Sequence, residues 1–179
     1  MEHEITLVFV YGTLMSGQRA HHFLSGGTLL GTWLLRGYAM YQVKNYPGIV
    51  EEPGKHVIGE VYAIPKNLLI RMDEYEEEGT LYHRRTVTVT RGMEQMEVQA
   101  YIYAKAVDPD TFMPEPWGSS DDDLVWYAGH GFRSESAGLC KITRAQLKHI
   151  NGPNQYPNLH CLDIAEDGAP IYTATSSEI

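Results

Sequence analysis

The sequence predicts an α+β fold organised around a mostly antiparallel, barrel-like β-sheet. Roughly five or six segments between residues 5 and 104 have the β-branched and aromatic composition of strands. One segment after Pro65 has the apolar spacing of a helix. Because 179 residues are enough to bury a sizeable core, we predict a single domain over residues 1–179.

The first strand leads directly into a loop of small residues. Residues 7–10 form a short apolar run that is typical of a strand buried on both faces, and the loop follows at residues 12–17. A loop held by a buried strand can direct several backbone N–H groups toward one point, which makes a cradle for an anion or an oxyanion. The alternative is an ordinary turn, since turns bounded by glycine are common.

Further strands are predicted up to residue 64. Residues 19–24 have the character of one or two helical turns, and residues 28–43 form a long apolar and aromatic segment. Gly31 and Gly37 lie inside this segment, so we expect one bent strand or two, with β-bulges or close backbone contacts at the glycines. Residues 57–64 form the next strand.

A helix is expected directly after Pro65, because proline is favourable in a first helical turn. Leu68, Met72 and Tyr75 are spaced as one apolar stripe, and acidic residues gather at its end, within residues 73–78. The helix dipole disfavours negative charge at a C-terminus. These acids either form a solvated surface, or one of them is held there for chemistry.

The next two strands have the pattern of a hairpin, and the region after them is less regular. Residues 81–91 and 94–104 alternate between two faces around a turn that contains glycine. Residues 124–128 are expected to form a helical turn, and residues 143–150 a short helix with Thr143 as its N-cap. The last twenty or so residues are rich in turn-forming types.

The overall composition excludes several classes of partner. The formal net charge is −9, and no basic cluster typical of a nucleic-acid-binding protein is present. The apolar run at residues 5–11 is too short for a membrane span or a signal peptide. Cys140 and Cys161 are too few for a disulfide framework, so we expect a cytoplasmic protein. The oligomeric state is left open.

The motifs of several catalytic mechanisms are absent from the sequence. There is no G-x-S-x-G nucleophile motif, no C-x-x-C or H-E-x-x-H metal motif, and no Gly-Lys-Ser/Thr ending to the loop at residues 12–17. His21 and His22 are adjacent, so they do not share a helix face and are a poor metal site. We therefore expect no metal and no cofactor. A backbone cradle and a cluster of carboxylates suit acid–base catalysis without a protein nucleophile.

Four ordered motifs give the chain a resemblance to a known family. These are Phe9-Val-Tyr-Gly-Thr-Leu14, Tyr46-Pro47, Gly59-Glu-Val-Tyr62, and Met72-Asp-Glu-Tyr-Glu76 with Tyr82-His-Arg84. Together they resemble the γ-glutamylcyclotransferase-like family, which includes γ-glutamylamine cyclotransferases and plant AIG2-like proteins. The resemblance covers residues 5–104 as a core, and residues 105–179 form an extended C-terminal segment of uncertain role.

The resemblance implies a small mixed barrel with flanking helices, and an enzyme that releases an amine or amino acid from a γ-glutamyl compound. The glutamyl part would leave as 5-oxoproline, in the reaction of a carbon–nitrogen lyase or an intramolecular aminoacyl transferase. The resemblance assigns the role of general acid and base to Glu76, and Glu77 and Glu78 are its close competitors for this role. The implied substrate-binding residues are Tyr11, Gly12, Thr13, Leu14 and Tyr82.

Several alternatives stay open from the sequence. Arg84 would either pair with Asp73 or Glu74, which is favoured, or touch the substrate. Tyr11 would either bind substrate or serve as a core aromatic at the end of the first strand. The function could instead be a γ-glutamyl amide hydrolase or acyltransferase, or a non-enzymatic module that binds a small anion. The identity of the leaving amine is not specified.

Overall fold

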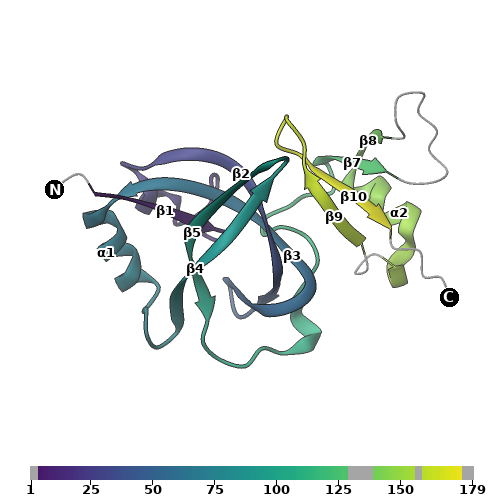
Figure 1. Cartoon of the computed structure of the whole chain (residues 1–179). Helices are drawn as coiled ribbons and strands as arrows, with labels where there is room; N and C mark the ends of the chain where they lie inside the picture. The colour runs from purple at the N-terminus through teal and green to yellow at the C-terminus, as the bar shows by residue number, and fades with distance from the viewer. Residues whose placement is uncertain (1–3, 129–138, 156–158, 175–179) are drawn as a thin grey trace. The chain divides into compact units, whose positions relative to one another are not determined.

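The computed structural model describes residues 4–128, 139–155 and 159–174. The chain divides into two compact units, Met1–Gly118 and Ser119–Ile179, and each has its own sheet (Figure 1). The sequence predicts one domain, with a core that ends at residue 104. The first unit extends further because β6 (Phe112–Met113) pairs with β2 (Thr28–Gln42).

The N-terminal unit is a closed, mostly antiparallel barrel. Its strands lie in the order β3-β1-β5-β4-β2-β6, and an additional pairing of β3 with β2 closes the sheet. The β1–β5 pair is parallel and the other pairs are antiparallel, which makes the sheet mixed. This confirms the predicted α+β fold class. The remaining elements of the unit are β1 (Ile5–Val10), η1 (His21–Leu24), β3 (Pro47–Pro65), α1 (Lys66–Tyr75), β4 (Tyr82–Arg91), β5 (Glu94–Tyr103) and η2 (Pro109–Thr111).

Strand β1 lies in the centre of the barrel wall between β3 and β5. Val8, Phe9 and Val10 are at most 3% exposed, as the apolar run predicts. Gly59 of β3 allows the close approach of β1, because a Cβ atom there would lie 2.4 Å from the Val10 carbonyl oxygen and 2.8 Å from Phe9 Cζ. The end of β1 is therefore held tightly where the loop of small residues begins.

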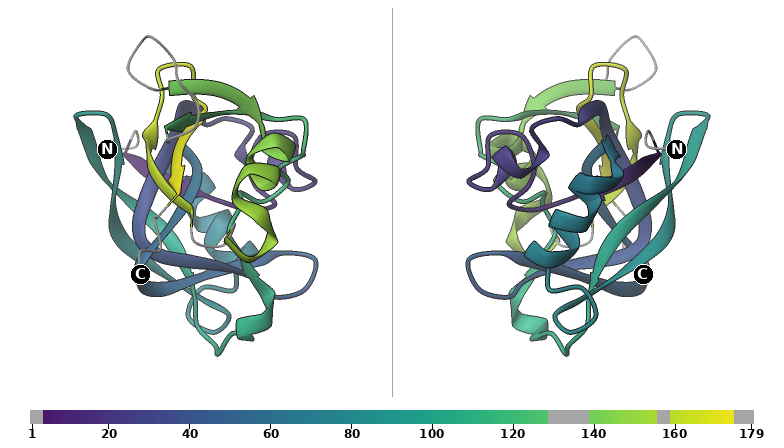
Figure 2. Two further views of the ribbon diagram at one scale, coloured as in Figure 1. Left: turned by 90° about the vertical axis from the view of Figure 1, so that its right-hand side faces the viewer. Right: turned by 90° about the vertical axis from the view of Figure 1, so that its left-hand side faces the viewer.

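Helix α1 lies against the barrel (Figure 2), and its contact with the barrel uses two residues of the apolar stripe that the sequence predicts. Leu68 and Met72 are buried, and they join a core cluster with Val8, Tyr62 and Tyr101. Tyr75, the third residue of the stripe, is 38% exposed. The helix thus buries one residue in each of two successive turns, and Tyr75 near its C-terminal end is partly exposed.

The described part of the C-terminal unit is a four-stranded sheet, in the order β8-β7-β10-β9, with one helix. Thr143 caps this helix as predicted, because its Oγ1 accepts from Gln146 N–H at 3.1 Å while Gln146 Oε1 accepts from Thr143 N–H at 2.9 Å. The helix continues beyond the predicted end at residue 150. The elements are β7 (Leu124–Ala128), β8 (Leu139–Thr143), α2 (Arg144–Gln155), β9 (Leu159–Ile164) and β10 (Pro170–Ala174).

Two sequence-based predictions for this unit are wrong. Leu124–Ala128 forms strand β7 and not a helical turn, because Val125 and Tyr127 alternate into the core and the strand pairs with β8 and β10. The last twenty or so residues, expected to be turn-rich, belong largely to two paired strands up to residue 174, and the rest lie outside the described residues. Neither helix of the described ranges has the length and hydrophobicity needed to cross a membrane.

The contact at Gly59 gives a prediction about stability. Replacing Gly59 with Ala should destabilise the protein by about 1–3 kcal/mol, because the added methyl group overlaps Val10 and Phe9. Chemical denaturation measures this change. Gly59 does not have a positive φ, so this loss reports the overlap and not backbone strain, whereas Gly54→Ala reports strain alone, since Gly54 has φ +88° and nothing lies within 4 Å of its Cβ position. Equal stability of the Gly59→Ala variant and the parent would contradict the proposed overlap.

Candidate active site

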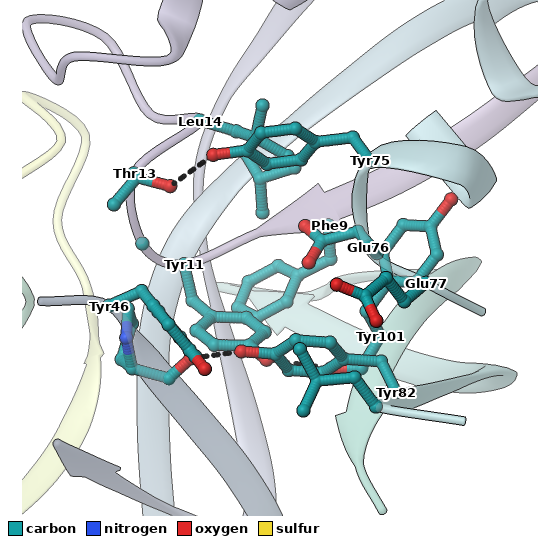
Figure 3. A pocket seen from close by; sticks show the side chains of 14 residues that line it. Phe9, Tyr11, Thr13, Leu14, Tyr46, Tyr75, Glu76, Glu77, Tyr82 and Tyr101 are labelled. Carbon is teal, nitrogen blue, oxygen red and sulfur yellow. Dashed lines mark hydrogen bonds between the residues drawn. The ribbon is translucent and has the colours of Figure 1, made fainter. Parts of the chain in front are cut away.

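A pocket of about 210 Å³ in the N-terminal unit brings together every site residue predicted from the sequence (Figure 3). The loop after β1 forms one side of this pocket, and the residues after α1 form the other. Aromatic side chains from the turn before β3 and from β4 and β5 complete the wall. The predicted residues that line it are Tyr11, Gly12, Thr13, Leu14, Glu76 and Tyr82.

The end of α1 places Glu76 at this pocket. The helix ends in a Schellman motif, in which Glu78 N–H donates to the Asp73 carbonyl at 2.9 Å and Glu77 N–H donates to the Glu74 carbonyl at 3.2 Å. Glu76 is the last residue with helical dihedral angles, and Glu77 takes the left-handed conformation with φ +53°. The turn therefore directs two consecutive glutamates to the pocket.

A hydrogen-bonded network anchors this helix end to the barrel. Arg84 of β4 binds Asp73 through two bonds, Nε to Oδ1 at 2.9 Å and Nη2 to Oδ2 at 3.2 Å. Tyr101 of β5 donates to Asp73 Oδ1 at 2.6 Å, and Tyr11 donates to the Tyr101 carbonyl at 2.7 Å. Burial, followed by the bond to Asp73, raises the pKa of Tyr101 well above its usual value. Arg84 thus pairs with Asp73, as favoured from the sequence, and does not line the pocket.

The loop after β1 is braced from two sides. A turn bond joins Met15 N–H to the Gly12 carbonyl at 3.0 Å, and Ser16 N–H donates to Glu60 Oε1 at 2.8 Å. Gly12 lies against Pro47, where a Cβ atom would be 2.6 Å from Pro47 Cγ. The motifs at residues 9–14, 46–47 and 59–62 therefore meet at this loop.

Tyrosines form most of the pocket wall. Tyr82 donates to the Pro47 carbonyl at 2.7 Å, and this bond joins the motif at residues 82–84 to the motif at residues 46–47. Tyr11 is buried in the core as well as lining the pocket, and its hydroxyl donates to the Tyr101 carbonyl, so its ring forms part of the pocket wall. The hydroxyls of Thr13 and Tyr75 lie 3.4 Å apart across the pocket (Figure 3).

The sequence did not assign eight of the pocket residues to the site, among them three tyrosines and Glu77. Tyr46 and Tyr75 belong to the quoted motifs, so the motifs could have identified them. Tyr101 lies in a strand whose alternation alone does not distinguish a pocket wall from the core. Glu77 was considered only as a competitor of Glu76, and both glutamates line the pocket.

The pocket changes the acid–base properties of Glu76. Burial raises the pKa of Glu76 to about 7, because a carboxylate loses hydration among these aromatic rings. The lining residues include no lysine, arginine or histidine that would offset this effect. A carboxyl group with such a pKa can both accept and return a proton near neutral pH.

Comparison with known proteins identifies the family of this chain. The family described as "Gamma-glutamyl cyclotransferase, AIG2-like" matches residues 8–119, which is most of the N-terminal unit. The chain belongs to this family. Two relatives in the family are the γ-glutamylaminecyclotransferase of Homo sapiens and the γ-glutamylcyclotransferase family protein YtfP of Escherichia coli. The human protein is 30% identical over 149 residues, covering 72% of this chain and 95% of its own. YtfP is 33% identical over 102 residues, covering 56% of this chain and 85% of its own.

Solved structures show the same fold. The AIG2-like protein of Mus musculus has a TM-score of 0.54 and 24% identity, and the match covers 61% of this chain and 83% of the mouse chain. YkqA of Bacillus subtilis has a TM-score of 0.58 and 15% identity, with 98% of this chain and 86% of that chain covered. The second match therefore includes the C-terminal unit. The predicted family and fold class are both confirmed.

The raised pKa of Glu76 predicts a pH-dependent effect on stability. In an unfolded chain this carboxyl ionises near pH 4.5, whereas in the folded protein its pKa is about 7. Folding therefore becomes less favourable as the pH rises from 4.5 through 7. Glu76→Gln should remove this penalty and raise the free energy of unfolding by roughly 2–3 kcal/mol at pH 8, with little effect at pH 4.

Denaturation of the parent and the Glu76→Gln variant at several pH values measures this difference. Glu74→Gln is the matched control, because Glu74 is exposed and does not line the pocket. A stability gap that does not change between pH 4 and pH 8 would show that Glu76 ionises normally.

Proposed function

We propose that this protein is a γ-glutamyl cyclotransferase that releases an amine or amino acid from a γ-glutamyl compound and forms 5-oxoproline. The observation that carries the proposal is the position of Glu76, whose pKa is about 7, in the same pocket as the braced turn at residues 12–14. No serine, cysteine or lysine lines this pocket. The reaction needs none, because the α-amino group of the substrate is the nucleophile.

The turn after β1 is suited to bind the glutamyl group. Gly12, Thr13 and Leu14 line the pocket, and their backbone N–H groups form no hydrogen bond within the described part of the chain. Such N–H groups bind a carboxylate or the oxygen of a carbonyl group that becomes negatively charged. We assign them to the glutamyl carboxylate or the γ-carbonyl oxygen. The tyrosine rings keep the bent glutamyl chain out of water.

Glu76 carries the protons in this mechanism. It first removes a proton from the α-ammonium group, and the free amine attacks the γ-carbonyl carbon to form the ring C–N bond. The tetrahedral intermediate then collapses, the bond to the leaving nitrogen breaks, and its electron pair takes up the proton that Glu76 returns. Glu76 then takes the second proton from the ring nitrogen and passes it to the released amine. In total, two protons leave the α-nitrogen and two reach the leaving nitrogen, so the products are 5-oxoproline and an ammonium ion.

The expected rate enhancement has two main sources. Well-oriented intramolecular attack reaches effective molarities of about 10⁵ M or more. General acid–base catalysis by a positioned carboxyl group adds about 10²- to 10⁴-fold. A pKa of about 7 suits both steps, because near neutral pH such a group can accept a proton from the substrate and also return it to the leaving nitrogen.

Substitution of Glu76 tests the mechanism. Glu76→Gln should lower kcat by about 10²- to 10⁴-fold, because the amide cannot shuttle protons, while the fold and ligand binding persist. The measurement is release of 5-oxoproline from a panel of γ-glutamyl compounds, with Glu74→Gln as the control that retains activity. Unchanged turnover in the Glu76→Gln variant would rule out this role.

Product analysis separates the proposal from its alternatives. A hydrolase or an acyltransferase would use the same pocket, with water or another amine as the attacking group. Hydrolysis gives free glutamate, and acyl transfer gives a new γ-glutamyl amide, whereas cyclotransfer gives 5-oxoproline. Binding of γ-glutamyl compounds without any of these products would indicate a non-enzymatic binding module.

The pH dependence of kcat/KM gives a further prediction. Because Glu76 must be ionised to accept the first proton, kcat/KM should rise with pH and level off above about pH 7. Initial rates between pH 5 and pH 9 with one substrate measure the profile. A plateau that already begins near pH 4.5 would mean that the essential base has an ordinary carboxyl pKa.

A further inference from the structure

Glu77 is a second carboxylate in the pocket, and the mechanism above does not use it. Its backbone has φ +53°, and within the described ranges it is the sole residue other than glycine with a positive φ. Glycine is the usual residue at this position of a Schellman motif, because a side chain costs about 1–2 kcal/mol there. A glutamate that is kept in a strained backbone conformation at a pocket suggests a role for its side chain.

The backbone of Glu77 is held by hydrogen bonds, whereas its carboxylate is not. The backbone is held by the bond to Glu74 and by Thr80 and Leu81, whose N–H groups donate to the Glu77 carbonyl at 3.1 and 3.0 Å. Its carboxylate, by contrast, forms no hydrogen bond or ion pair with the described part of the chain. The turn therefore fixes where this charge lies and leaves it available to a ligand.

The charge of the pocket indicates which ligand would benefit. The charged lining residues are Glu76 and Glu77, with no lysine, arginine or histidine among the others. The nearby Arg84 is already paired with Asp73 and lies outside the lining. A negatively charged substituent would be repelled by this pocket, and a positively charged one would be attracted.

The order of the two glutamates indicates which part of the substrate meets Glu77. In the proposed reaction the glutamyl part of the substrate binds the turn of residues 12–14 through its carboxylate or its γ-carbonyl oxygen, and the leaving nitrogen lies beside Glu76. Both carboxylates point into the pocket in Figure 3, and Glu77 is the more exposed residue of the two. We therefore infer an orientation in which a substituent on the leaving nitrogen extends away from the turn, past Glu76, toward Glu77.

We propose that Glu77 selects γ-glutamyl compounds whose leaving amine carries a second positive charge, as the monoamide of a diamine does. This inference rests on the proposed cyclotransferase function. Glu77 is then a specificity-determining residue that contacts the leaving amine. Glu76 alone transfers protons.

Three substrates of equal length test the proposal with the full chain. They are the γ-glutamyl amides of 1,4-diaminobutane, n-pentylamine and 5-aminopentanoate, which end in an ammonium, a methyl and a carboxylate group. The parent should show kcat/KM about two- to fivefold higher for the ammonium than for the methyl compound, which is the range for a partly exposed ion pair. The carboxylate compound should be the poorest, and added salt should reduce these differences.

Variants at residue 77 then assign the preference to this side chain. Glu77→Gln should bring the ratio between the ammonium and methyl compounds to about one, and Glu77→Lys should favour the carboxylate compound. Glu77→Gly removes the carboxylate without backbone strain, so it tests the same point if Gln disturbs the turn. Glu74→Gln is the matched control and should keep the parental preference.

The outcomes separate this inference from the function on which it rests. Release of 5-oxoproline from none of the three compounds would overturn both. Release at equal kcat/KM from the ammonium and methyl compounds would overturn the inference and leave the function standing. An equal loss for all three compounds in Glu77→Gln would also overturn it, because Glu77 would then contact the shared glutamyl part.

Discussion

The bond between Arg84 and Asp73 is the constraint on which the arrangement of the pocket depends. Helix α1 contacts the barrel mainly through Leu68 and Met72, and its last turn carries acidic residues that the helix dipole disfavours. Arg84 and Tyr101 compensate for one of these charges and tie the helix end to β4 and β5. Because the bond to Arg84 is bidentate and both Asp73 oxygens are used, the orientation of the last turn is well defined.

A second set of contacts holds the opposite side of the pocket. Gly59 allows β1 and β3 to approach closely, Glu60 accepts from the loop, and Pro47 fills the space beside Gly12. Tyr82 then joins this side to β4. The backbone groups that would bind a glutamyl moiety and the carboxyl group that would move its protons are thus held by separate contacts. Closure of the barrel is what brings the two sides together.

The pocket contains two features that lower stability. A carboxyl group is buried without a cationic partner in the lining, and the next residue has a backbone conformation that suits glycine. Both belong to the same turn at the end of α1. Strain and buried charge of this kind are concentrated at functional sites and are balanced by stability elsewhere. Here the balance comes from the apolar core around β1 and from the network at Asp73.

The sequence alone determined the elements whose signals are local. The buried run of β1, the stripe of α1, the cap at Thr143 and the four family motifs are each readable within a few residues, and the motifs singled out Glu76. Only the tertiary structure decided how Tyr46, Tyr75 and Tyr101 share one pocket, that Arg84 supports the helix end, and that Glu77 faces the same space as Glu76. It also decided that residues 124–128 pair as a strand in a separate unit. The reason is that these features come from contacts between residues far apart in the chain, and pairing of the strands into sheets creates those contacts.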